Sequence, residues 1–220
     1  MFEVSPRLKT MTAIKESSDE LNPPAAVSAT QISAPKHRTP LDYLALAIAT
    51  CGVGYVPLAP GTLGSLVGIG LYLTVWGWLY GILEAKAARG RLDLLYIFTP
   101  QFAFMLLLIF IVGIAGVWAA TRAEKVVQRK DPSIVVIDEV AGQMIALLSG
   151  PFWIQTWWSI LSAFILFRLF DIWKPYPIRR LEALDYGLGI MADDLLAGVY
   201  ALIVNSLLIS GYLLLFATRG

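Results

Sequence analysis

Cysteine, histidine and charged residues are all scarce in this chain of 220 residues. The single cysteine, Cys51, excludes an internal disulfide and a cysteine-rich metal site, and its ordinary role is that of a small buried side chain. The only histidine, His37, lies in a polar N-terminal region, so no histidine is expected in a catalytic site. The net charge of +1 gives no electrostatic reason to expect a nucleic-acid partner.

The shortage of charge is concentrated in a few long segments. Charged residues make up 15% of the chain, against about 25% in a soluble globular domain. Four segments contain no charged residue and no histidine: Tyr43–Leu83, Leu94–Thr121, Val140–Phe167 and Leu195–Thr218. A helix needs roughly 20 apolar residues to cross a bilayer. The sequence therefore predicts an all-α, polytopic membrane helical bundle.

The first 40 residues differ from the rest of the chain. They are polar and rich in Pro and Ser, and they have neither the apolar core of a signal peptide nor the Arg-rich, acid-poor composition of a transit peptide. We predict a disordered cytosolic tail over residues 1–40 and a single membrane-embedded domain over residues 41–220.

Apolar runs and breaker residues predict the helices of this domain. The stretch from Gly52 to Gly64 is rich in Gly and Pro and is predicted as a loop, and Glu84–Asp93 as a turn. Helices are predicted over Leu41–Cys51, Ser65–Leu83, Leu94–Thr121, Ile137–Ser149, Trp153–Phe170 and Asp194–Phe216.

The segment Val140–Phe167 allows two topologies. Read as a single span, it would place Glu139 and Asp171 on opposite faces of the membrane. Gly150-Pro151 interrupts it, which favours a hairpin of two shorter helices that returns to its starting face. With the hairpin, 13 of the 17 Lys and Arg residues lie on one face, which the positive-inside rule assigns to the cytoplasm. The single span divides them nearly evenly, so we predict the hairpin.

Five carboxylates lie at apolar boundaries on this cytoplasmic face: Asp138, Glu139, Asp171, Asp193 and Asp194. Acidic residues beside membrane helices are costly unless they are paired or bind a metal. Asp138 and Asp194 are explained equally well as residues that stabilise a helix N-terminus. That explanation fails for Asp171, which lies near the C-terminal end of its predicted helix.

Two cations accompany Asp171 on one helical side. Arg168, Asp171 and Lys174 are spaced i, i+3 and i+6, and Pro175 predicts that the helix ends at Lys174. This row suits a phosphate bound by Arg168 and Lys174 beside a metal bound by Asp171. A solvated row of ion pairs is the simpler alternative.

The Gly-rich segment Pro57–Ser65 opens a helix and suits anion binding through backbone N–H groups, with the hydroxyls of Thr62 and Ser65. An ordinary capped helix start explains the spacing equally well. The segment is not a Walker A loop, and the chain has neither a Cys-x5-Arg loop nor an Asp-x-Asp motif. The side chains left for a catalytic site are carboxylates and hydroxyls, and these hard oxygen ligands fit Mg²⁺.

Four segments in this order resemble the phosphatidylglycerophosphatase A family. They are Gly52–Ser65, Ile137–Gln143, Phe167–Pro177 and Gly189–Gly198. The resemblance implies Mg²⁺-dependent hydrolysis of phosphatidylglycerophosphate to phosphatidylglycerol and phosphate, at the cytoplasmic face of a bacterial inner membrane. It implies catalytic and metal-binding roles for Asp138, Glu139, Asp171, Asp193 and Asp194, and phosphate binding by Thr62, Ser65, Arg168 and Lys174.

Some features of the site stay open at this point. Neighbouring helical residues point about 100° apart, so both members of an acidic pair need not bind one ion. The sequence does not distinguish attack by water from attack by a carboxylate. A CDP-alcohol phosphotransferase is disfavoured because its Asp-x-x-Asp-Gly signature is missing. A transporter would place carboxylates inside the spans, whereas these lie at one boundary.

Overall fold

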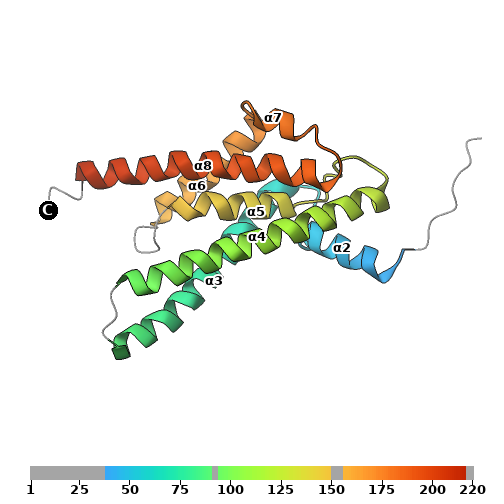
Figure 1. Cartoon of the computed structure of the whole chain (residues 1–220). Helices are drawn as coiled ribbons and strands as arrows, with labels where there is room; N and C mark the ends of the chain where they lie inside the picture. The colour runs from blue at the N-terminus through green and yellow to red at the C-terminus, as the bar shows by residue number, and fades with distance from the viewer. Residues whose placement is uncertain (1–37, 91–93, 150–155, 217–220) are drawn as a thin grey trace, which may run out of the picture. The chain divides into compact units, whose positions relative to one another are not determined.

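The computed structural model describes residues 38–90, 94–149 and 156–216, with the side chains of residues 88–97 and 216 excepted. Regular structure in these ranges is entirely helical, which confirms the all-α class (Figure 1). The helices are α2 (Pro40–Thr50), α3 (Pro60–Gly90), α4 (Leu94–Val127), α5 (Ile137–Ala146), α6 (Trp157–Trp173), α7 (Ile178–Leu181) and α8 (Gly187–Phe216), with a 3₁₀ turn, η1, at Leu147–Ser149.

Two sequence predictions fall on other parts of the chain. The predicted tail, except for Arg38–Pro40, and the predicted break at Gly150-Pro151 lie outside the described residues. The tail and the hairpin therefore stay predictions. The two arms of the proposed hairpin are described in part, as α5 with η1 and as α6.

Three helices are long and apolar enough to cross a membrane. The qualifying segments are Pro60–Ala87 in α3, Phe98–Val127 in α4 and Gly187–Leu215 in α8, with mean hydropathies of 1.6, 2.6 and 1.9. Large apolar side chains are exposed on these helices, among them Phe110 at 64% and Leu214 at 73%. Outward-facing apolar side chains fit a lipid environment, and the chain is a membrane protein.

Helix α3 departs from its predicted bounds at both ends. It begins at Pro60 rather than Ser65 and continues to Gly90, so Gly61 and Gly64 are helical, as is most of the predicted turn. Proline is favoured at the first helical position. The two glycines are helical because other segments pack closely against them. A Cβ on Gly64 would lie 3.0 Å from Val136 Cβ. The glycines let α3 approach the start of α5.

Helix α8 begins at Gly187 rather than Asp194. The Gly187 N–H donates to Thr121 Oγ1 at 3.1 Å, and a Cβ on Gly187 would lie 2.5 Å from the Thr121 backbone nitrogen. Close packing on α4 thus fixes the start of α8. Asp193 and Asp194 lie almost two turns inside the helix, so the N-terminus explanation fails for Asp194.

The short helix α5 lies between α3 and α8 and makes its most extensive contacts with α8 (Figure 1). A Cβ on Gly198 of α8 would lie 3.0 Å from Gly142 Cα of α5, and a Cβ on Gly142 would lie 2.6 Å from the Asp194 carbonyl oxygen. The backbones of α5 and α8 therefore touch directly. The fully buried Phe167 of α6 packs against the same position of α5.

Helix α2 fixes the start of α5. The Val136 N–H donates to the Ala49 carbonyl oxygen at 2.8 Å, directly before the first residue of α5. Helix α2 is in turn held on α4 by an ion pair of 2.7 Å between Asp42 Oδ1 and Arg122 Nε. The hydrogen bond and the burial of Ala49 thereby position Asp138 and Glu139 in the first turn of α5.

A polar cluster around Asn205 joins α8 to both arms of the proposed hairpin. Asn205 is 1% exposed; its amide nitrogen donates to Ser149 Oγ at 2.6 Å and to the Ser159 carbonyl at 3.1 Å. Its amide oxygen accepts from Ser162 Oγ at 2.6 Å. Ser149 belongs to η1, whereas Ser159 and Ser162 belong to α6, so one side chain ties the two segments to α8.

Candidate active site

The predicted site residues gather around one cavity of about 800 Å³. Eight of the nine line it: Thr62, Asp138, Glu139, Arg168, Asp171, Lys174, Asp193 and Asp194. The ninth, Ser65, is fully buried, and its hydroxyl donates to the Gly61 carbonyl oxygen at 3.0 Å, one helical turn earlier. Segments distant in sequence thus converge on a single acidic cavity.

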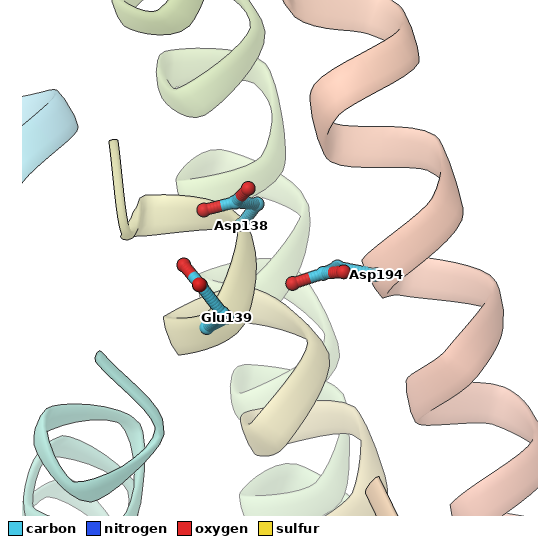
Figure 2. A group of neighbouring side chains, drawn as sticks. All are labelled: Asp138, Glu139 and Asp194. Carbon is cyan, nitrogen blue, oxygen red and sulfur yellow. The ribbon is translucent and has the colours of Figure 1, made fainter. Parts of the chain in front are cut away.

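Three carboxylates form the inner cluster. Asp138 and Glu139 come from the first turn of α5, and Asp194 faces them from α8 (Figure 2). One oxygen of each lies within 4.8 Å of the other two. This juxtaposition follows from the backbone contact of α5 and α8, because the Asp194 carbonyl is itself packed against Gly142.

Asp138 and Asp194 are buried and Glu139 is half-buried, and some of their oxygens lack hydrogen-bond partners among the described residues. Asp138 is 8% exposed, and neither Asp138 Oδ1 nor Glu139 Oε2 has a hydrogen-bond partner among the described residues. Burial raises the pKa of Asp138 well above its usual range, and the neighbouring charges of Glu139 and Asp194 raise it further. Burial likewise raises the pKa of Glu139. Clustered carboxylate oxygens with unused acceptor capacity form a donor set that fits a hard divalent cation.

The two remaining carboxylates are each paired with a cation. Asp171 Oδ2 lies 2.8 Å from Arg168 Nη1, within the last two turns of α6. Asp193 Oδ2 accepts a hydrogen bond of 2.7 Å from Lys174 Nζ. The predicted row of Arg168, Asp171 and Lys174 is therefore divided between two ion pairs, and the second reaches across to α8.

The end of α6 directs Lys174 into the cavity. The helix ends at Trp173, as Pro175 predicts, and Lys174 adopts a left-handed backbone conformation with φ of 47°. Burial alone lowers the pKa of Lys174, but its hydrogen bond to Asp193 and the surrounding carboxylates outweigh burial, so the pKa is raised. Lys174 therefore stays protonated and can hold an anionic ligand.

Arg168 is packed under the start of α3. A Cβ on Gly61 would lie 3.1 Å from Arg168 Nη1 and would overlap Glu139 Oε1. Arg168 Nη1 has no hydrogen bond of good geometry among the described residues, because its close contact with Asp171 is poorly aligned. Arg168 therefore keeps an N–H group without a hydrogen-bond partner among the described residues, next to Glu139 of the inner cluster.

The outer part of the cavity contains residues that the sequence did not single out. Five of them are Lys130, Asp131, Arg179, Glu182 and Tyr186. Glu182 Oε1 lies 3.6 Å from Lys174 Nζ, so it extends the ion pairs of the inner site. These residues come from the segment after α4 and the segment around α7, where no motif or regular spacing marks them in the sequence.

Comparison with known proteins identifies the family. The family model described as phosphatidylglycerophosphatase A matches residues 46–209, about three quarters of the chain. The chain belongs to the phosphatidylglycerophosphatase A family. It is therefore a lipid phosphatase, and the family match covers every predicted site residue.

Two similar proteins carry the name of the family, and a third carries a different name. A phosphatidylglycerophosphatase A of Haemophilus influenzae is 39% identical over 154 residues, covering 70% of this chain and 80% of that protein. The phosphatidylglycerophosphatase A of Escherichia coli is 31% identical over 149 residues, 67% and 73% of the two chains. A protein of Bacteroides thetaiotaomicron, named provisionally as a phosphatidylinositol-3-phosphatase, is 39% identical over 153 residues, 70% and 85%. No solved structure matches the chain significantly.

Proposed function

We propose that this member of the phosphatidylglycerophosphatase A family hydrolyses phosphatidylglycerophosphate to phosphatidylglycerol and phosphate, with Mg²⁺ as cofactor. The observation that carries the proposal is the convergence of two buried carboxylates and one half-buried carboxylate, Arg168 and Lys174 on one cavity. A dianionic phosphate monoester needs cations on its oxygens, and an acidic cavity supplies them by binding a metal.

Asp138, Glu139 and Asp194 would hold the Mg²⁺, since their oxygens are grouped and Asp138 Oδ1 and Glu139 Oε2 have no hydrogen-bond partner among the described residues. When bound, the ion supplies Lewis-acid chemistry that activates water or stabilises the leaving alkoxide. Oxygen ligands of this kind favour Mg²⁺ over softer metals. The buried charges also repel one another, so a divalent ion would stabilise the cluster.

Arg168 and Lys174 would hold the phosphate oxygens, with Thr62 adding a hydroxyl at the start of α3. Asp171 and Asp193 orient these two cations through their ion pairs of 2.8 and 2.7 Å. In the reaction a P–O bond to the attacking oxygen forms and the P–O bond to the headgroup glycerol breaks. The leaving glycerol oxygen gains a proton and becomes the free hydroxyl of phosphatidylglycerol.

The surroundings of the cavity fit a substrate that stays in the membrane. Tyr55 and Leu58, 60% and 82% exposed, precede the cavity-lining start of α3. Trp173 and Tyr176, 64% and 71% exposed, flank Lys174. Aromatic and apolar side chains exposed beside a charged site are typical of a membrane–water interface, where a lipid headgroup lies.

We place the cavity at the cytoplasmic face, because 13 of the 17 Lys and Arg residues fall on its side under the hairpin topology. Cysteine labelling of whole cells tests this orientation. In a Cys51→Ser background, Arg129→Cys should be protected from an impermeant maleimide, and Lys86→Cys, in the last turns of α3, should react. The reverse pattern would refute the orientation, and equal labelling would refute the crossing of the membrane by α4.

The Bacteroides relative favours a second candidate substrate, phosphatidylinositol 3-phosphate. Phosphate release from purified protein in mixed micelles distinguishes the candidates. Phosphatidylglycerophosphate, phosphatidylinositol 3-phosphate and phosphatidic acid are compared at equal surface concentration, with Mg²⁺ and with EDTA. We expect the highest kcat/KM for phosphatidylglycerophosphate and no release with EDTA. A higher value for the inositol lipid would replace the proposed substrate, and metal-independent release would refute the metal site.

A further inference from the structure

The cavity is larger than the proposed reaction centre needs. Its volume is about 800 Å³, whereas a phosphate with its metal takes the space of a few water molecules of about 30 Å³ each. The outer part therefore has room for the remainder of a lipid headgroup. Two cations that line the cavity, Lys130 and Arg179, are exposed, whereas the inner site residues are buried or half-buried, so we assign these two to the outer part.

The local fold holds both cations at the rim. Lys130 precedes Asp131, whose φ of 47° reverses the chain, and the Asp131 N–H donates to the buried Glu124 carboxylate at 3.1 Å. Arg179 lies in α7, directly after Ile178, which is fully buried and anchors this short helix. The two side chains therefore approach the cavity from separate, anchored segments.

Neither rim cation forms an ion pair with a carboxylate of the described residues, whereas both inner cations do. The rim also carries Asp131 and Glu182. Glu182 is directed to Lys174, at 3.6 Å, and the carboxylate of Asp131 forms no ion pair with Lys130 or Arg179. Lys130 and Arg179 thus remain available for an anion in the cavity.

We propose that Lys130 and Arg179 bind the diester phosphate of the lipid and thereby select substrates that carry a phosphodiester in addition to the phosphate removed. The inference rests on the proposed function, in which the monoester occupies the inner site. In phosphatidylglycerophosphate a glycerol bridge separates the monoester from the diester, which links the headgroup to the acyl chains. The diester must then lie outside the inner site, in the part of the cavity that Lys130 and Arg179 line. Phosphatidic acid has no second phosphate and makes no use of the rim.

Steady-state kinetics of Lys130→Gln, Arg179→Gln and the double variant test the proposal. For phosphatidylglycerophosphate we expect kcat/KM to fall about tenfold in each single variant and about 100-fold in the double variant, because a charge-assisted contact is lost each time. Turnover of phosphatidic acid should stay within about threefold of the wild type. Arg179→Lys, which keeps the charge, should recover most of the loss.

Arg129→Gln is the matched control, because Arg129 adjoins Lys130 and is exposed but does not line the cavity. It should change kcat/KM by less than about twofold. An equal loss in Arg129→Gln would show that these residues only attract the protein to an anionic membrane, and would overturn the proposal. So would an equal loss on phosphatidic acid, or no loss on the diester lipid.

Direct binding separates this proposal from the proposed function. The product phosphatidylglycerol retains the diester, so native mass spectrometry should show weaker phosphatidylglycerol binding in the double variant than in Arg129→Gln. If the wild type releases no phosphate from phosphatidylglycerophosphate, the proposed substrate fails, while this difference still supports a diester site. Equal phosphatidylglycerol binding by the two variants overturns the diester site whatever the activity. Thermal unfolding confirms that each variant is folded.

Discussion

Gly61→Ala should impair catalysis while leaving the fold intact. A Cβ at this position would overlap Glu139 Oε1 and would lie 3.1 and 3.3 Å from the two terminal nitrogens of Arg168. The carboxylate must move by roughly 1 Å to restore ordinary contact. A displacement of this size at a reaction centre costs about 100-fold in rate, which corresponds to about 2.7 kcal/mol of barrier. Stability should not fall, since alanine is favoured over glycine in a helix by up to about 1 kcal/mol.

Phosphate release, Mg²⁺ affinity by titration calorimetry and the unfolding temperature measure the three effects. Gly70→Ala is the matched control, because Gly70 lies in the same helix and a Cβ there meets nothing within 4 Å. It should keep full activity and gain slightly in stability. Activity of Gly61→Ala within about threefold of the wild type, with unchanged Mg²⁺ affinity, would refute the claim that this glycine sets the position of Glu139.

Three further predictions concern the metal, the packing and the thiol. Asp138→Asn should lower Mg²⁺-dependent activity by about 1,000-fold and abolish stabilisation by Mg²⁺. Its unfolding temperature should nevertheless be no lower than that of the metal-free wild type, because the repulsion between buried carboxylates is reduced. Asn205→Leu should lower the free energy of unfolding by about 1–2 kcal/mol in detergent while the variant still binds Mg²⁺; a neutral effect would contradict the role of its hydrogen bonds. Burial raises the pKa of Cys51 to about 11, so alkylation at pH 8 should be about 100-fold slower than in the unfolded chain; equal rates would contradict this shift.

The sequence was informative about the site because charged side chains beside membrane helices cost free energy unless they have a function. Carboxylates beside long apolar runs are rare without a function, and Asp171 could not be explained as an N-terminal residue. Helix α6 continues to Trp173, past the predicted bound of Phe170, but it stops where Pro175 predicts, since proline restricts the residue before it. These inferences depend on local spacing and on the membrane, both of which are visible in one sequence.

Features that depend on distant contacts were not predictable. Gly61 and Gly64 indicated a loop, because glycine disfavours helix unless packing requires it, and the requirement comes from Val136 and Glu139 far along the chain. The pairing of Lys174 with Asp193 joins residues 19 positions apart, one directly after α6 and the other in α8. Arg179 at the cavity rim follows from the anchoring of a four-residue helix that no periodicity marks.

The glycine contact between α5 and α8 has a consequence for the choice of ion. No side chain separates the two helices at Gly142 and Gly198, so the main-chain contact sets the distance between the backbone of Asp194 and that of the acidic pair of α5. Helices α5 and α8 cannot move closer together around a smaller ion, and moving apart around a larger ion would break the contact between them. The helix packing itself would then select the ion by its radius. Gly198→Ala, which adds one methyl group between α5 and α8, should move the helices apart and shift the preference from Mg²⁺ toward Ca²⁺.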